Sequence, residues 1–139
     1  MKYLLDTCVL SETVRLVPSA RVLAWLAAAD EHDLFLPAIV LGELRKGAER
    51  RDDDARKVAL SRWVDECHVR YGERIVPFDD EVADLWGKQV ACLQKRGKTP
   101  PVIDSQIAVT ALYHGMTLVT RNVRDMAEFG VDIINPFDE

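Results

Sequence analysis

Short apolar runs that alternate with segments of helical periodicity restrict this chain to few architectures. The runs lie at residues 3–5, 34–36, 75–76, 118–119 and 131–134. Between them, apolar residues recur at helical spacing, as Leu60, Trp63, Val64 and Cys67 do. Buried strands joined through helices pair in parallel, with helices covering the sheet. The pattern therefore predicts an α/β fold, a three-layer α/β/α sandwich around a central, mostly parallel β-sheet.

The length and the termini bear on domain count and location. The chain has 139 residues without a linker or repeat, so we expect one domain over residues 1–139. No apolar run approaches the roughly 20 residues that a membrane span needs. The first six residues reach an acid after only three apolar ones, unlike a signal peptide. We therefore expect a cytoplasmic protein with no membrane segment.

The charge of the chain limits how it meets nucleic acid. A net charge of −5 excludes a protein that coats nucleic acid through overall positive charge. Basic residues nevertheless crowd three regions: Arg45, Lys46, Arg50, Arg51, Arg56, Lys57 and Arg62; Lys95, Arg96 and Lys98; Arg121 and Arg124. Such runs are usually solvated helix faces. The alternative is an acidic enzyme that handles phosphates at one place.

Asp6 directly follows the first predicted strand. In open α/β sheets, ligands bind beyond the carboxyl ends of the strands, so this acid is placed for a functional site. The other interpretation is that Asp6 only caps the next helix.

Glu43 interrupts the apolar segment 38–44 at the start of a predicted helix. A glutamate is rarely buried without a partner. That partner is either a metal ion or an arginine such as Arg45 or Arg121.

Two further acids stand at predicted helix starts. Asp104 begins the helix expected over residues 102–114, and Asp125 begins the one expected over 125–129. Either is explained by the preference of acids for helix N-termini. Taken with Asp6 and Glu43, however, they form a set of four carboxylates near strand ends.

Such a set of carboxylates predicts a divalent-metal site. Crowded carboxylates repel one another unless a cation joins them, and Mg²⁺ or Mn²⁺ prefers oxygen ligands. A bound cation activates water and stabilises charge on a phosphate, so the chemistry needs no histidine base. His32, His68 and His114 all lie away from the strand ends.

Four motifs in order resemble the PIN domains of VapC and FitB ribonuclease toxins. They are residues 4–12 (LLDTCVLSE), 41–47 (LGELRKG), 104–111 and 118–125 (LVTRNVRD), followed by the tail Asn135-Pro136-Phe137. The resemblance spans the chain. It implies a PIN-like α/β/α fold and a Mg²⁺- or Mn²⁺-dependent endoribonuclease of a toxin–antitoxin pair.

The resemblance also implies roles for single residues. Asp6, Glu43 and Asp104 would be metal ligands, and Thr7 would support them by hydrogen bonding. Family members place a fourth acid at either of two positions, which here are Asn122 and Asp125. We expect Asp125 to be the fourth catalytic and metal-binding acid, with Asn122 as a helper. Cys8 stands where asparagine is common.

The partners implied by the resemblance are an RNA substrate, a second copy of the chain in a homodimer, and a cognate VapB-like antitoxin. The toxin would contact DNA only indirectly, through the antitoxin. Two other functions stay open: a DNA-directed or structure-specific nuclease, and a catalytically weak partner-binding module. Trp63 and Trp86 lie on apolar helix faces, so we expect core or dimer packing rather than stacking on bases.

Overall fold

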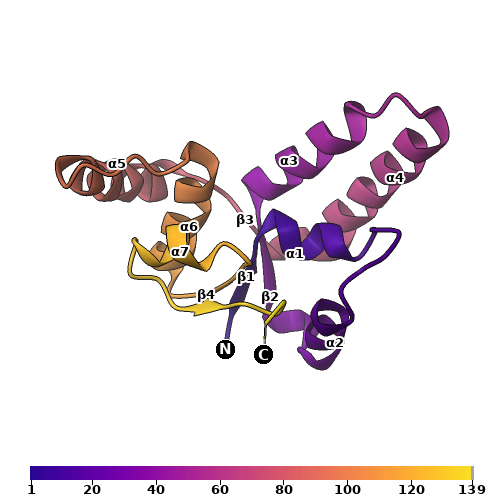
Figure 1. The fold of residues 1–139 in the computed structure, drawn as a ribbon, viewed down its shortest axis with the longest axis horizontal. Helices are drawn as coiled ribbons and strands as arrows, with labels where there is room; N and C mark the ends of the chain where they lie inside the picture. The colour runs from indigo at the N-terminus through magenta and orange to yellow at the C-terminus, as the bar shows by residue number, and fades with distance from the viewer. Residues whose placement is uncertain (139) are drawn as a thin grey trace.

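The computed structural model describes residues 1–138 and has a five-stranded sheet at its centre (Figure 1). The strands are β1 (Tyr3–Leu5), β2 (Leu34–Pro37), β3 (Ile75–Val76), β4 (Thr117–Val119) and β5 (Ile133–Ile134). Their order is β3-β2-β1-β4-β5. All four pairings are parallel, which confirms the predicted α/β fold.

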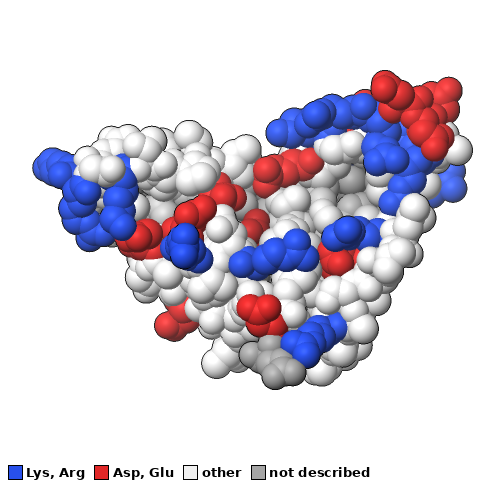
Figure 2. Space-filling view, in the orientation of Figure 1, with Lys and Arg blue, Asp and Glu red and all other residues white. Residues whose placement is uncertain are grey.

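Within residues 1–138, seven α-helices surround the sheet, and four of them form two diverging arms (Figure 1). They are α1 (Thr7–Glu12), α2 (Ala20–Ala28), α3 (Ala38–Glu49), α4 (Asp54–Tyr71), α5 (Asp80–Lys95), α6 (Val102–His114) and α7 (Val123–Ala127). One arm is made by α3 packed against α4, and the other by α5 packed against α6. Figure 2 shows a hollow between the arms in which acidic side chains gather.

The central strand explains why the core forms where it does. Leu4 and Leu5 of β1 are fully buried, because β1 pairs with strands on both sides. Leu5 lies beside Val119 in the register of β1 and β4, and the backbone N–H of Asp6 donates to the Val119 carbonyl at 3.0 Å. The ends of these two strands therefore meet at one edge of the sheet.

Local side-chain and glycine signals set several helix ends. The Ser19 hydroxyl accepts from the backbone N–H of Val22 and begins α2, and Asp53 caps α4 in the same way. Gly115 ends α6 with a φ of 65°, a left-handed conformation that costs glycine little. None of the helices within residues 1–138 is long and apolar enough to cross a membrane.

Two predicted boundaries near the C-terminus are wrong. The helix expected over residues 125–129 is α7, residues 123–127, and the strand expected over 131–134 covers only 133–134. The Thr120 hydroxyl accepts from the backbone N–H of Asn122 at 3.0 Å, so the chain turns directly after β4 and the helix begins early. Asp125 consequently lies within the first turn of α7.

Candidate active site

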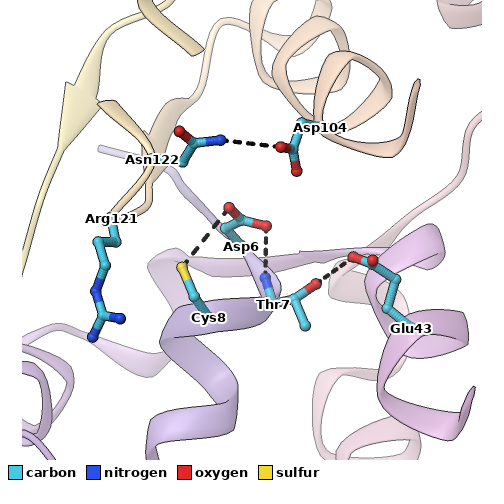
Figure 3. Close-up of a pocket in the computed structure, with 7 residues that line it drawn as sticks. All are labelled: Asp6, Thr7, Cys8, Glu43, Asp104, Arg121 and Asn122. Carbon is cyan, nitrogen blue, oxygen red and sulfur yellow. Dashed lines mark hydrogen bonds between the residues drawn. The ribbon is translucent and has the colours of Figure 1, made fainter. Parts of the chain in front are cut away.

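The carboxyl end of the sheet opens into a pocket of about 480 Å³ (Figure 3). Its lining joins residues from the start of α1, from α3, from α6 and from the loop after β4: Asp6, Thr7, Cys8, Glu43, Asp104, Arg121 and Asn122. The topology thus brings together three of the four predicted acids and both predicted helper residues. We call it the acid pocket.

Asp6 is the most enclosed acid of the pocket, with 6% of its surface exposed. One oxygen, Oδ1, accepts from the backbone N–H of Thr7 at 2.7 Å, which makes Asp6 the N-cap of α1. The other, Oδ2, accepts from the Thr120 hydroxyl at 2.7 Å. Asp6 therefore caps α1, as the alternative interpretation expected, and also lines the pocket.

Burial is the main cause that raises the pKa of Asp6. The hydrogen bonds from Thr120 and Thr7 lower it, and the charge of Glu43 raises it further. A buried carboxylate beside another carboxylate is a group whose charged form a cation would stabilise.

The partner of the Glu43 carboxylate is a hydroxyl group rather than an arginine. The Thr7 hydroxyl donates to Glu43 Oε1 at 2.6 Å (Figure 3). Arg45 instead pairs with Asp65 at 2.5 Å, and Arg121 stacks on the ring of Phe137 at 3.7 Å from its centroid. The negative charge of Glu43 thus stays available to the pocket.

Asp104 faces the other two acids from the first turn of α6. The side-chain amide of Asn122 donates to Asp104 Oδ2 at 3.0 Å (Figure 3). Burial raises the pKa of Asp104 most, and the charges of Asp6, Glu43 and Asp125 raise it as well. The acids are therefore electrostatically coupled.

Asp125 does not line the acid pocket. Its side chain is exposed and lines a separate pocket of about 280 Å³ with Lys98, Arg124 and Glu128. Its charge nevertheless acts on Asp104. The structure thus places Asn122 in the pocket wall and Asp125 outside it.

The donor set fits a hard divalent cation. Three carboxylates line the pocket, and Mg²⁺ or Mn²⁺ binds through one or two carboxylates plus waters. As they stand within residues 1–138, no three Asp, Glu, His or Cys side chains form a cluster tight enough to hold a metal ion. Ligation by all three acids would exchange some of their hydrogen bonds for metal bonds.

Asp6 has two further neighbours, of which sequence reasoning missed Thr120. Thr120 is fully buried and connects Asp6 to the backbone of Asn122. The Cys8 sulfur lies 3.9 Å from Asp6 Oδ2, and burial raises the pKa of this thiol, which favours its neutral form. The only available signal for Thr120 was its position, first after the strand that pairs with β1.

The three histidines are exposed, and none is among the residues that line the acid pocket. The three acids and the Cys8 thiol are thus the groups of the lining that exchange protons. Arg121, the one cation of the lining, points away from them (Figure 3).

Comparison with known proteins agrees with this geometry. The family model described as PIN domain matches residues 3–131. The chain belongs to the PIN-domain family. Among curated PIN-domain relatives, Toxin FitB of Neisseria gonorrhoeae is 33% identical over 137 residues, which cover 98% of this chain and 99% of FitB. VapC ribonuclease Y4jK of Sinorhizobium fredii is 34% identical over 135 residues, 96% of each chain.

A solved structure of FitAB bound to an IR36 DNA fragment contains a chain with the same fold. It superposes with a TM-score of 0.92 at 33% identity and covers 99% of this chain and 96% of that one. The PIN-domain architecture predicted from the sequence is therefore confirmed.

Proposed function

We propose that this PIN domain is a divalent-metal-dependent endoribonuclease and the toxin of a toxin–antitoxin pair. One observation carries the proposal: Asp6, Glu43 and Asp104, from three separate segments, converge in one pocket. The pKa values of Asp6 and Asp104 are raised partly by the charges of the other acids. The names of the FitB and VapC relatives supply the substrate class and the toxin role.

The cofactor in this proposal is Mg²⁺ or Mn²⁺, held by Asp6, Glu43 and Asp104. Once bound, such an ion supplies an activated water and stabilises the charge that develops on the phosphate. Thr7 holds Glu43, Thr120 holds Asp6, and Asn122 holds Asp104. Asp125 is the fourth acid of the set. It lies outside the pocket wall, and its negative charge acts on Asp104 and so favours binding of a cation in the pocket.

The proposed partners follow from the relatives. The FitAB structure contains a second component together with DNA, which supports a VapB-like antitoxin partner that is responsible for DNA contact. A net charge of −5 gives this chain little general attraction for DNA. We include a homodimer on the family resemblance, and we place the activity in the cytoplasm, where RNA substrates are found.

The test is cleavage of a mixed RNA pool with Mg²⁺, Mn²⁺ or EDTA by wild type, Asp6→Asn and Asp84→Asn. Asp84 is exposed and pairs with Lys88 at 3.1 Å on α5, so Asp84→Asn is a charge-matched control. We expect cleavage with metal, none with EDTA, and loss in Asp6→Asn alone.

Two other outcomes would change the proposal. Cleavage of DNA of matched sequence but not of RNA would indicate a DNA-directed nuclease. Absence of Mn²⁺ binding by the folded wild type would indicate a partner-binding module.

A further inference from the structure

A second pocket, of about 310 Å³, adjoins the acid pocket on the side of the α3–α4 arm. The two pockets share Thr7 and Glu43 in their linings. A chain molecule with one phosphate among the acids would therefore have a neighbouring unit beside the second pocket. We call it the flanking pocket.

Three arginines line the flanking pocket, and Glu43 is its only acid among the residues described. Arg56 donates to the carbonyl of Val14 at 2.6 Å, and Arg15 pairs with buried Glu12 at 3.3 Å. Both guanidinium groups are thus held in place, and each keeps further N–H donors. Arg51 is exposed and, within residues 1–138, has no salt bridge.

The remaining wall is apolar and aromatic. Leu44, Leu60 and Trp63 line it, and Trp63 also packs against the hydrophobic core. The sequence predicted core or dimer packing for Trp63 rather than stacking on bases; the core packing is present, but the place of Trp63 in a pocket lining was not predicted. An indole held by core packing is a rigid surface on which a nucleobase stacks at little entropic cost.

Cations beside an aromatic wall match the chemistry of a single-stranded nucleotide. Figure 2 shows Lys and Arg side chains gathered on the α3–α4 arm above the acid-lined hollow. This local positive charge stands out in a chain whose net charge is −5.

We propose that the flanking pocket binds the RNA nucleotide next to the scissile phosphate. Arg51 and Arg56 contact its phosphate, and the indole of Trp63 stacks on its base. This proposal rests on the nuclease function proposed above and adds to it the place where the substrate chain lies beside the acids. A base held there gives the enzyme a means to select among RNA sequences.

The test measures binding rather than cleavage. A fluorescein-labelled, single-stranded oligoribonucleotide is titrated with Asp6→Asn protein, and its anisotropy reports Kd at several salt concentrations. The same titration is made with Arg51→Gln added. Arg62→Gln is the matched control, because Arg62 is exposed on α4 and is not among the residues that line the flanking pocket.

We expect Arg51→Gln to weaken binding about fivefold and to reduce the slope of log Kd against log salt by about 0.7, the value for one lost phosphate contact on a single strand. Arg62→Gln leaves both unchanged. Trp63→Leu weakens binding at least fivefold, as loss of one stacked base does, with the salt slope unchanged. Trp63→Phe, which keeps a ring in the same place, retains most of the affinity, and thermal melting verifies that both variants are folded.

Equal effects of Arg51→Gln and Arg62→Gln would overturn the flanking pocket as a site and leave only diffuse attraction. Wild-type RNA cleavage together with unchanged binding in the Arg51 and Trp63 variants would overturn the pocket but keep the nuclease. No RNA binding by the Asp6→Asn parent and no cleavage by wild type would overturn both. Binding of an acidic peptide that Arg51→Gln and Trp63→Leu weaken, with RNA binding unchanged in the same variants, would assign the pocket to a protein partner instead.

Discussion

The hydroxyl of Thr120 donates a 2.7 Å hydrogen bond to Asp6 Oδ2 and thereby connects the ends of two neighbouring parallel strands. The same hydroxyl accepts from the backbone N–H of Asn122 at 3.0 Å. One buried side chain thus orients Asp6 and sets the turn that carries Asn122 toward Asp104.

Replacement of Thr120 by valine keeps the shape of the side chain and removes the donor. The hydrogen bond from Thr120 lowers the pKa of Asp6, so its loss raises that pKa further. We expect the acid limb of the pH–rate profile to move to higher pH. We also expect a loss of about 1–3 kcal/mol in the free energy of unfolding, the usual cost of an unsatisfied buried group.

Thr120→Ser is the control, since it keeps the hydroxyl and should retain the wild-type pH profile. A pH profile that is the same in Thr120→Val and wild type would show that Thr120 does not act through Asp6.

In the metal-free protein, the acid pocket should change stability with pH in the opposite direction to carboxylates that pair with a cation. The pKa values of Asp6 and Asp104 are raised above the ordinary 3.8, so the folded state binds protons more readily than the unfolded state. Their contribution to stability therefore increases as pH falls from above the raised values toward 3.8. Glu31 and Glu128, whose pKa values are lowered by Arg70 and Lys98, contribute with the opposite sign.

Comparison with Asp6→Asn isolates the acid pocket from those surface groups. In EDTA we expect Asp6→Asn to melt at a higher temperature than wild type at pH 7, with a difference that shrinks as the pH approaches 4. Thermal melts followed by circular dichroism measure it. A wild type that is the more stable of the two at pH 7 in EDTA would contradict the raised pKa of Asp6.

Asn122 and Asp125 should differ in how they support the site. Asn122 donates a hydrogen bond to Asp104. Loss of a residue that hydrogen-bonds to a metal ligand typically lowers metal affinity or activity about 10–100-fold. We therefore expect Asn122→Ala to lower kcat/KM at least tenfold. Asp125 is exposed and acts on Asp104 through its charge, so Asp125→Asn should lower metal affinity only a few-fold. That smaller effect should disappear at about 1 M salt, where the Debye length is about 3 Å.

The measurement is RNA cleavage as a function of Mn²⁺ concentration at low and high salt. A loss in Asp125→Asn as large as that in Asp104→Asn, independent of salt, would show that Asp125 binds the metal directly.

The strands and most helices were predictable because their signals are local. Burial of β1 follows from its run of apolar residues, and α2 and α4 begin at Ser19 and Asp53, whose side chains cap them. The convergence of Asp6, Glu43 and Asp104 was predictable as well, because the carboxyl ends of parallel strands share one edge of the sheet.

The details of the site depend on contacts that no sequence pattern records. The Thr120 hydroxyl could have met solvent or backbone, and only the pairing of β1 with β4 brings it to Asp6. Helix α7 begins at Val123, two residues before its predicted start, and Asn122 rather than Asp125 lines the pocket. Likewise, the sequence could not tell whether Arg45 pairs with Glu43; in the structure Arg45 pairs with Asp65 instead.

Binding of Mn²⁺ is the direct readout of the acid pocket as a divalent-cation site. Isothermal titration of wild type, Glu43→Gln, Asp104→Asn and the control Asp84→Asn separates ligands from bystanders. We expect wild type and Asp84→Asn to bind Mn²⁺ alike, and each pocket variant to bind at least about tenfold more weakly. Equal Mn²⁺ affinity in all four proteins, or no binding by any, would show that the acid pocket is not a metal site.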